Sequence, residues 1–424
     1  MKTAIVSGCR TPFTRAGTEL RELSAIDLGK AAVREALARA DLNGEAVDQL
    51  VFGTVVHDPQ APNIAREVGL AVLPKEVPAT TVSRACASSN QAIADGVNLI
   101  ELGQAQIVVA GGAESLSHIP IAASESLARI LLEASKARSL KQRVSVFLRL
   151  RPKDLVPVWP QIAEPTTGET MGQAAERMAK ENGITRTAQD KWALRSHRRA
   201  IQGMEDGRLT AEITPVYLPP AFETIVNRDN GVRVDTSLGL LEDLYPVFDK
   251  KHGSVTAGNA SPLTDGGAAL VLMSSRAVKA HGVKPLAWIR SFAITALDPG
   301  AQLLQGPSYA APLALDLARI SMKDIDLMEM HEAFAAQVLS NLQALDSSKF
   351  ARDMLGRSSP IGHPELDRIN VMGGSIALGH PFGATGARIT LTLANELRRI
   401  NGEFGLLTVC AAGGMGFAMV IQRA

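Results

Sequence analysis

The stretch FGLLTVCAAGGMGFAMVIQ, residues 404–422, contains two apolar runs separated by a short glycine-rich segment. Apolar runs of this length with glycines between them predict two buried β-strands joined by a tight turn. The run GGAALVLMS, residues 266–274, resembles the second of these strands. We interpret it as the counterpart of that strand, displaced by a long insertion, so the sequence predicts two similar halves.

Elsewhere, short apolar runs alternate with amphipathic helical patterns. Strands are predicted at residues 3–8, 47–56 and 105–115. Helices are predicted at residues 24–40, from just after Cys86 to about Leu102, and within residues 380–400 after a glycine-rich turn. Ser24 and Asp27 have the spacing of a capping box at the start of the first helix. This alternation is typical of βαβ units with parallel strands and predicts an α/β protein.

Residues 119–253 differ in character from the segments on either side. Prolines gather between residues 152 and 165, and two helical patterns with a loop-rich tail follow. We interpret this segment as a separate loop domain. The predicted division is an N-terminal half at residues 1–118 and 254–280, the inserted domain at residues 119–253, and a C-terminal half at residues 281–424.

Residues 125–155 of the insertion are strongly basic. The cationic side chains are Arg129, Lys136, Arg138, Lys141, Arg143, Arg149, Arg151 and Lys153, against the acidic Glu125, Glu133 and Asp154. Apolar stripes beside this charge are predicted from Leu127, Ile130, Leu131, Val144, Phe147 and Leu148. The pattern indicates a basic amphipathic helix that contacts an anionic membrane surface or a partner protein. The alternative is a solvated helix that packs on its own domain.

The composition of the 424 residues narrows the possible functions and predicts two or three domains. Lys and Arg number 44 and Asp and Glu number 43, so the chain lacks the net positive charge that binds nucleic acid. Its three cysteines, Cys9, Cys86 and Cys410, are too few for a disulfide framework or a zinc site, and no metal is expected. No signal peptide or membrane helix is expected, and the predicted location is the cytoplasm.

Cys86 lies in RACASSNQAIADG, residues 84–96, immediately before a predicted helix. A buried structural cysteine is the more common case for such a stretch alone. A helix N-terminus nevertheless favours an anion, and this predicts an accessible thiolate at neutral pH. His380 in GGSIALGHPFGATGAR, His331 in MEMHEAFAAQ and Cys410 in LLTVCAAGGMG are the candidate partners. Each alone is more often structural, but together they supply a base and an acid for a nucleophile.

Five ordered motifs strongly resemble those of the thiolases: CASSNQAI, TAGNASPLTDGGAA, HEAF, GGSIALGHPFGATGAR and CAAGGMG. The resemblance extends over essentially the whole chain. It implies a five-layered αβαβα fold of two similar halves, a loop domain inserted in the first half, and active sites in a dimer or larger assembly. Within the family, the chain most resembles the 3-ketoacyl-CoA thiolase β-subunit of the trifunctional fatty-acid oxidation complex. His331, where most members carry Asn, the alanines of CAAGG and the basic insertion support this closer resemblance.

The reaction implied by the resemblance is cleavage of a 3-ketoacyl thioester between C2 and C3. Cys86 would be the nucleophile that carries the acyl group, and His380 would take its proton. His380 and His331 would bind the enolate oxygen of the departing acetyl-CoA. Cys410 would protonate the enolate carbon and later help to deprotonate coenzyme A. An acid and a base with pKa values near that of a thiol suit such thioester exchange.

Three further residues are assigned by the same resemblance. The backbone N–H groups of Cys86 and Ala412 would bind the oxygen of the tetrahedral intermediate. Ser261 would hold the pantetheine arm, and Met171 would line the site. No metal or redox cofactor is implied, because coenzyme A is a substrate.

Other functions remain open on the sequence. An acetoacetyl-CoA thiolase is one, although TMG at residues 170–172 lacks the histidine that the short-chain biosynthetic members carry before the methionine. A decarboxylating ketoacyl synthase is another, and Cys410 argues against it because that reaction needs no second cysteine as acid. A non-catalytic scaffold is the third, and it would not require these residues.

The partners implied by the resemblance are acyl-CoA and coenzyme A, a second copy in a homodimer, and a hydratase/dehydrogenase α-subunit. Residues 125–155 would hold the complex at the inner surface of the membrane. No nucleic-acid partner is expected.

Overall fold

The computed structural model describes residues 2–158 and 163–424, so Pro160, one of the clustered prolines, lies outside the described residues. The strands are β1 (Thr3–Arg10), β2 (Thr14–Arg15), β3 (Gln49–Gly53), β4 (Ala79–Val82), β5 (Ile107–Glu114), β6 (Val216–Tyr217), β7 (Ile225–Val226), β8 (Thr264–Ser274), β9 (Ala287–Ala296), β10 (Ile325–Met330), β11 (Phe404–Ala411) and β12 (Met415–Arg423). The helices are α1 (Ala25–Arg39), α2 (Ile64–Val72), α3 (Ser88–Glu101), α4 (Glu125–Lys136), α5 (Leu140–Phe147), α6 (Met171–Glu181), α7 (Arg186–Glu205), α8 (Arg208–Glu212), α9 (Leu238–Glu242), α10 (Ser275–His281), α11 (Gly306–Ala318), α12 (Ala335–Asp346), α13 (Ser348–Leu355), α14 (Ser375–Leu378) and α15 (Thr385–Ile400). All of the strands and helices predicted by residue range are present, and Ser24 and Asp27 form the predicted capping box.

The main sheet is mixed and joins two halves. Its strand order is β10-β11-β12-β9-β1-β8-β5-β3-β4, with β2 paired to β8. The prediction of parallel strands is correct for β4, β3 and β5 and for β10 and β11. It is wrong for β1 and β8, which run antiparallel to their neighbours in this sheet, as do β9 and β12. The turn between β11 and β12 is too short for a crossover, so this pair must be antiparallel.

The two halves correspond to each other. β8 pairs antiparallel with β5 in the first half, as β12 does with β11 in the second. This agrees with the interpretation of residues 266–274 as a counterpart of the last strand. The halves meet where residues 3–5 of β1 pair with residues 287–289 of β9.

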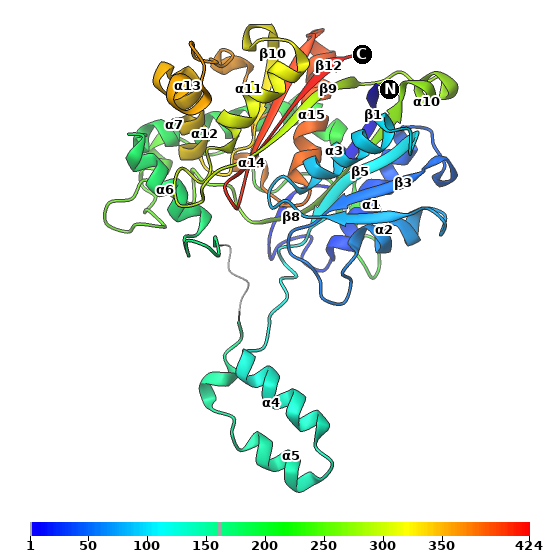
Figure 1. Cartoon of the computed structure of the whole chain (residues 1–424), viewed down its shortest axis with the longest axis vertical. Coiled ribbons are helices and arrows are strands. Elements are labelled where there is room, and N and C mark those ends of the chain that lie inside the picture. The colour runs from blue at the N-terminus through cyan, green and yellow to red at the C-terminus, as the bar shows by residue number, and fades with distance from the viewer. Residues whose placement is uncertain (1, 159–162) are drawn as a thin grey trace.

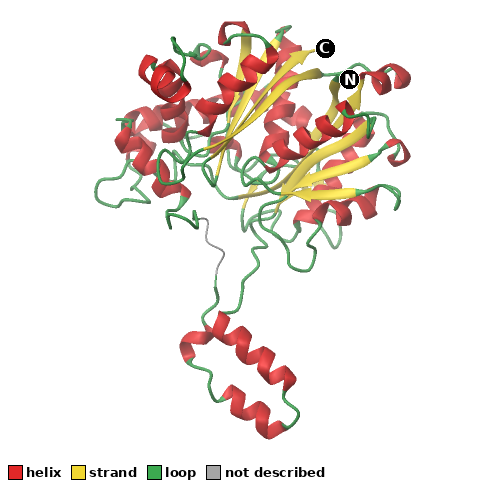
Figure 2. Cartoon of the chain, viewed as in Figure 1, coloured by secondary structure: helices red, strands yellow, loops and turns green. Residues whose placement is uncertain are grey.

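Helices form three layers around the two half-sheets (Figure 1). α1 and α2 cover the outer face of the first half, and α11 and α12 cover the outer face of the second. α3 and α15 lie between the half-sheets and share one apolar core with both. The alternation of helix and strand layers, visible in Figure 2, is the predicted five-layered αβαβα arrangement.

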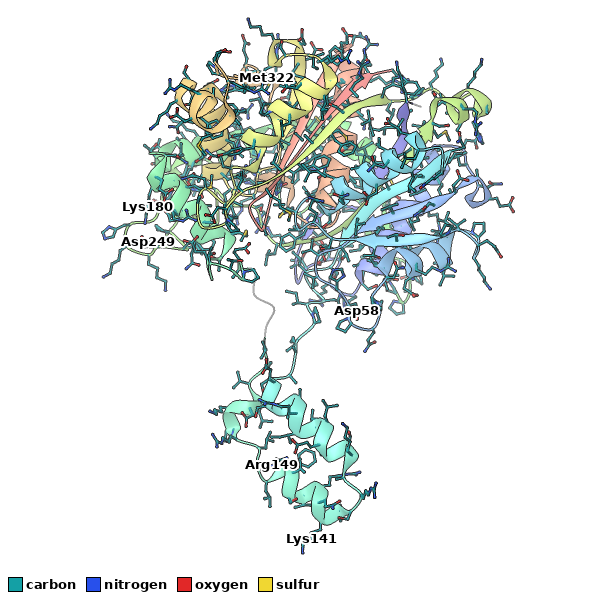
Figure 3. All side chains as sticks on the ribbon, in the orientation of Figure 1. Asp58, Lys141, Arg149, Lys180, Asp249 and Met322 are labelled. Carbon is teal, nitrogen blue, oxygen red and sulfur yellow. The ribbon has the colours of Figure 1, made fainter. Side chains whose placement is uncertain are left out.

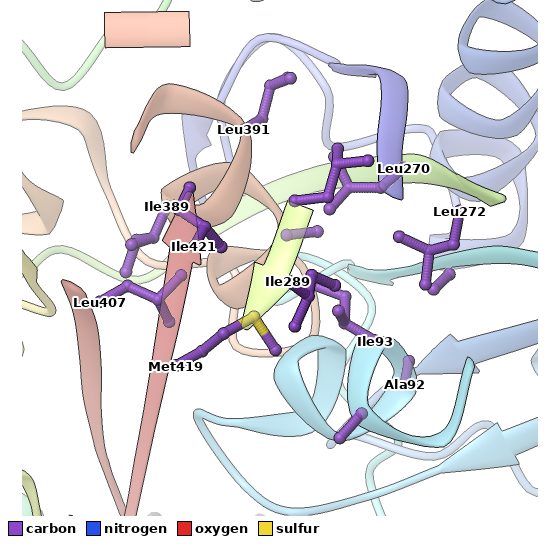
Figure 4. Packing of buried hydrophobic residues seen from close by; sticks show 14 of the residues in the cluster. Ala92, Ile93, Leu270, Leu272, Ile289, Ile389, Leu391, Leu407, Met419 and Ile421 are labelled. Atoms are coloured by element: carbon purple, nitrogen blue, oxygen red, sulfur yellow. The ribbon is translucent and has the colours of Figure 1, made fainter. Parts of the chain in front are cut away.

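The central core shows how the strand pattern produces these layers. Leu270 and Leu272 of β8 face the central helices, whereas Val271 between them faces α1. Such alternation is expected because successive strand side chains point to opposite faces. Ile93 of α3 and Ile389 of α15 fill the space between the half-sheets (Figure 4).

The basic segment projects from the body as a hairpin of two helices, α4 and α5, rather than one helix (Figures 1 and 3). The chain leaves helical geometry at Ala137, and the Ser139 side chain caps a new helix by accepting from the N–H of Gln142. Residues 122 and 158 pair at the base of the hairpin. No described helix has both the length and the apolar content to span a membrane.

Candidate active site

Cys86 lies on a constrained turn between β4 and α3. Ala85 before it has a left-handed backbone, with φ of +45°. The Ser88 hydroxyl accepts from the N–H of Arg84 at 2.8 Å and donates to the carbonyl of Ala85 at 2.7 Å. These bonds hold the turn that presents the cysteine, which is the only half-buried one of the three cysteines.

The surroundings of Cys86 disfavour its thiolate. Burial raises the pKa of the thiol to about 11, although a hydrogen bond from the backbone N–H of Ala412 opposes this shift. The expectation of an accessible thiolate at neutral pH is therefore wrong for the resting enzyme. α3 begins only at Ser88, and the N–H groups of Ala87 and Ser88 already donate to carbonyls within the turn.

His380 is a neutral proton acceptor whose tautomer is fixed by Thr385. The Thr385 hydroxyl donates to the carbonyl of Pro381 at 3.0 Å. Its oxygen, 2.7 Å from Nδ1 of His380, must therefore accept from that nitrogen. The Nδ1–H tautomer leaves the lone pair on Nε2. Burial and the charge of Arg388 lower the pKa of His380 to about 3, so the imidazole is neutral near pH 7.

His331 follows β10, and its ring centroid lies 4.1 Å from that of His380. Its Nδ1 is 3.1 Å from the hydroxyl of Ser375, which also accepts from Arg388 at 3.2 Å. Since Arg388 only donates, the Ser375 hydroxyl accepts from it and can donate its own proton to Nδ1 of His331; in this tautomer the ring proton of His331 lies on Nε2. Burial, His380 and Arg388 hold the pKa of His331 well below its usual range. The two histidines therefore present one acceptor and one donor.

The structure brings the nucleophile and the two histidines together. The Sγ of Cys86 and one ring nitrogen from each of His331 and His380 all lie within 4.8 Å of one another. Among the described residues, the Nε2 atoms of both histidines have no hydrogen-bond partner. The same three donor types could ligate zinc. A nucleophile, an acceptor and a donor are equally the set that acyl transfer requires.

Cys410, at the end of β11, is fully buried. Burial and the charge of a Cys86 thiolate hold the pKa of its thiol well above the usual range, so this thiol lies close enough to Cys86 to be affected by its charge. Cys410 belongs to an apolar cluster that Met171, the first residue of α6, packs against. Ser261 lies close to the loop after His331, because its N–H donates to the carbonyl of Ala333 at 2.9 Å.

Two buried carboxylates that the sequence analysis did not identify hold the histidine loops. Glu114 accepts from the N–H of Gly383 at 2.9 Å and from that of Val56 at 2.9 Å, which ties the His380 loop to the first half. Burial raises the pKa of Glu114 to about 7. Glu332 accepts from the Trp192 ring at 3.0 Å and from Asn370 at 2.8 Å. The available signal was a charged residue at the end of a buried strand, since Glu114 is the last residue of β5 and Glu332 lies two residues beyond β10.

A cysteine beside a proton acceptor and a hydrogen-bond donor, on two joined α/β halves, is typical of enzymes that transfer acyl groups through a cysteine. The thiolase N-terminal domain matches residues 3–276, and the thiolase C-terminal domain matches residues 283–423. The chain belongs to the thiolase family, and it is an acyltransferase of that family. The predicted family and fold class are confirmed.

Individual relatives agree with this assignment. The 3-ketoacyl-CoA thiolases of Yersinia pestis (strain Pestoides F) and Yersinia pseudotuberculosis serotype O:1b (strain IP 31758) are each 51% identical over 422 residues, 99% of this chain and 97% of theirs. The structure of the Bacillus anthracis acetyl-CoA acetyltransferase matches with a TM-score of 0.86 and 32% identity, covering 100% of this chain and 99% of that one. Human mitochondrial 3-ketoacyl-CoA thiolase matches with a TM-score of 0.84 and 33% identity, covering 100% and 99%.

Proposed function

We propose that this enzyme cleaves 3-ketoacyl-CoA with coenzyme A, giving acetyl-CoA and an acyl-CoA shortened by two carbons, in fatty-acid β-oxidation. The observation that carries the proposal is the meeting of Cys86 with a neutral acceptor, His380, and a neutral donor, His331, within 4.8 Å. Relatives that are 51% identical to this chain are named 3-ketoacyl-CoA thiolases, which supports the same reaction.

In the first half-reaction, Sγ of Cys86 bonds to C3 of the substrate and its proton moves to Nε2 of His380. The charge on the C3 oxygen meets the N–H groups of Cys86 and Ala412, which stabilise it as it forms. The C2–C3 bond then breaks, and its electron pair leaves with C2 as the acetyl-CoA enolate. The enolate oxygen accepts from His331 and from the protonated His380, while Cys410 donates its proton to C2.

In the second half-reaction, the Cys410 thiolate takes the proton of the incoming coenzyme A thiol. The coenzyme A sulfur attacks the acyl group on Cys86, and the Cys86 sulfur leaves as a thiolate. That thiolate recovers its proton from His380, so every group returns to its starting state. Ser261 would hold the pantetheine arm, and Met171 would line the site. A solved relative, human mitochondrial 3-ketoacyl-CoA thiolase, binds CoA, which supports coenzyme A as a substrate here. No metal or redox cofactor is needed for these steps.

The test is steady-state thiolysis of 3-ketoacyl-CoA substrates of graded chain length, combined with mass spectrometry of the acyl-enzyme. The expected results are turnover of substrates longer than acetoacetyl-CoA and an acyl adduct on Cys86. Turnover of acetoacetyl-CoA alone would favour the acetoacetyl-CoA thiolase, for which the acetyltransferase relative is the supporting observation. Decarboxylation of a malonyl thioester would favour the synthase, and no adduct would favour the scaffold.

The helical hairpin, residues 125–155, supports a further proposal about location. Its apolar side chains Leu131, Leu132, Leu140, Val144 and Leu148 are exposed, beside the cationic side chains named above. Exposed leucines among cations suit an anionic bilayer, where each Lys or Arg near the surface contributes about 1 kcal/mol. We propose that the enzyme lies in the cytoplasm and, through this hairpin, at the inner membrane surface. The resemblance to the trifunctional β-subunits supports a homodimer that joins a hydratase/dehydrogenase α-subunit.

A further inference from the structure

The turn that carries Ala412 has little rigidity of its own. β11 and β12 pair up to Ala411 and Met415, so residues 412–414 form the whole connection. Gly413 and Gly414 both have left-handed backbones, with φ of +82° and +68°. Glycine populates many conformations at low cost, so two adjacent glycines give a turn whose peptide planes need external support.

Two bonds from other parts of the chain provide that support. The N–H of Leu297 donates to the carbonyl of Gly414 at 2.7 Å. On the other side, the N–H of Gly413 donates to Oε2 of Glu164 at 2.8 Å. The Gly413 N–H belongs to the peptide group that begins at Ala412, so its bond to Glu164 fixes the orientation of Ala412. Ala412 is the residue whose own N–H donates to Cys86.

Glu164 is itself well placed for this task. It is only 6% exposed. Its backbone N–H donates to the carbonyl of Glu169 at 2.7 Å, and its carbonyl accepts from Gly168 at 2.8 Å. The segment 163–170 is thereby closed on itself, directly before α6. A side chain on so constrained a segment holds its partner at a defined position.

We propose that Glu164 is a positioning residue for the oxyanion site: by accepting from Gly413, it keeps the Ala412 N–H aimed at the reacting centre. The proposal rests on the function proposed above. Glu164 acts as an acceptor and not through its charge, because a negative charge beside a developing oxyanion would oppose it. The inserted domain thus contributes directly to the catalytic geometry of the two halves.

Three substitutions of Glu164 separate the effect of side-chain length from the effect of charge. Glu164→Gln keeps an acceptor oxygen at the same distance and removes the charge, whereas Glu164→Asp keeps the charge and shortens the side chain. Glu164→Ala removes both. A donor of this kind in an oxyanion site contributes about 10²–10³-fold to kcat, so Ala and Asp are expected to lower kcat at least about 10-fold. Gln is expected to stay within about threefold of the wild type, and KM should change little in all three.

The measurements are kcat and KM for thiolysis, the burst of acyl-enzyme on Cys86, and thermal unfolding to confirm folding. Glu169→Ala is the matched control, since its carboxylate pairs with Arg177. Wild-type kcat in Glu164→Ala, or a loss in Gln as large as in Asp, would overturn the proposal. A matching loss in Glu169→Ala would indicate general damage to the segment and would also overturn it. An inactive wild type would instead refute the proposed function.

Discussion

Thr385→Val tests whether the tautomer of His380 is held by one hydroxyl. Valine has nearly the shape of threonine but cannot accept from Nδ1 of His380 or donate to Pro381. Thr385 and His380 are both buried, so water cannot replace either hydrogen bond when the hydroxyl is removed. The change therefore removes the hydrogen bond of 2.7 Å that orients the base, with little change of volume.

The effect on rate follows from how the bond changes during the reaction. His380 is neutral at rest and positively charged after it takes the Cys86 proton. A hydrogen bond to a neutral group contributes about 0.5–1.5 kcal/mol, and one to a charged group about 1.5–3 kcal/mol. Loss of the bond therefore raises the activation free energy of attack by this difference, about 1–1.5 kcal/mol. This corresponds to roughly a 5- to 13-fold loss of kcat. Freedom of the ring to adopt the other tautomer would add to this loss.

Thr385→Ser is the matched control because it keeps the hydroxyl. We expect its kcat to stay within about twofold of the wild type, while KM stays unchanged in both variants, since the side chain acts through His380. Thermal unfolding checks that the two proteins are folded. Equal kcat values for the valine and serine variants would show that the hydroxyl does not hold the base.

Three other outcomes follow. Cys86→Ala should abolish both turnover and the acyl adduct seen by mass spectrometry, and retained thiolysis would refute the role of Cys86 as nucleophile. The pKa of the Cys86 thiol is raised to about 11, so the thiolate fraction grows as the pH rises towards that value. Iodoacetamide should therefore alkylate Cys86 slowly at pH 7 and faster at alkaline pH. A rate that reaches a plateau below pH 8 would contradict this. The enzyme or its complex should pellet with anionic liposomes at low salt and be released at high salt, and reversing the charges of Lys141 and Arg143 should weaken this binding and spare thiolysis of short substrates. Failure of the wild type to bind liposomes, even with its partner present, would favour a protein contact or a solvated face.

Local signals in the sequence were sufficient for the strands and helices that were predicted by residue range, but not for the break between α4 and α5. The capping box at Ser24 and the glycine turn before α15 are short-range patterns, and both are present in the structure. The antiparallel direction of β8 and β9 could not be read in the same way. It depends on pairing with β1, which lies more than 250 residues away along the chain from either strand.

The site could be predicted to a similar extent. The family motifs named Cys86, His331, His380 and Cys410. The structure brings the first three together, and the pKa of Cys410 is raised in part by the charge of Cys86. The raised pKa of Cys86 could not be predicted, because it depends on burial, which is a property of the folded chain. Glu164 could not be predicted either, because its contact with Gly413 joins residues 249 positions apart.

The protonation states of Cys86 and His380 at rest explain why Cys86 becomes reactive only when the substrate is bound. A thiol with a pKa raised to about 11 and an imidazole with a pKa lowered to about 3 exchange a proton unfavourably when they are alone. A bound ketone changes this balance, because the negative charge of the sulfur moves onto an oxygen that the N–H groups of Cys86 and Ala412 can stabilise. Proton transfer and attack are therefore coupled, and the reactive thiolate is not exposed beforehand. The burial that suppresses the thiolate also protects Cys86 from other electrophiles, and it makes the position of the Ala412 turn decisive for the rate.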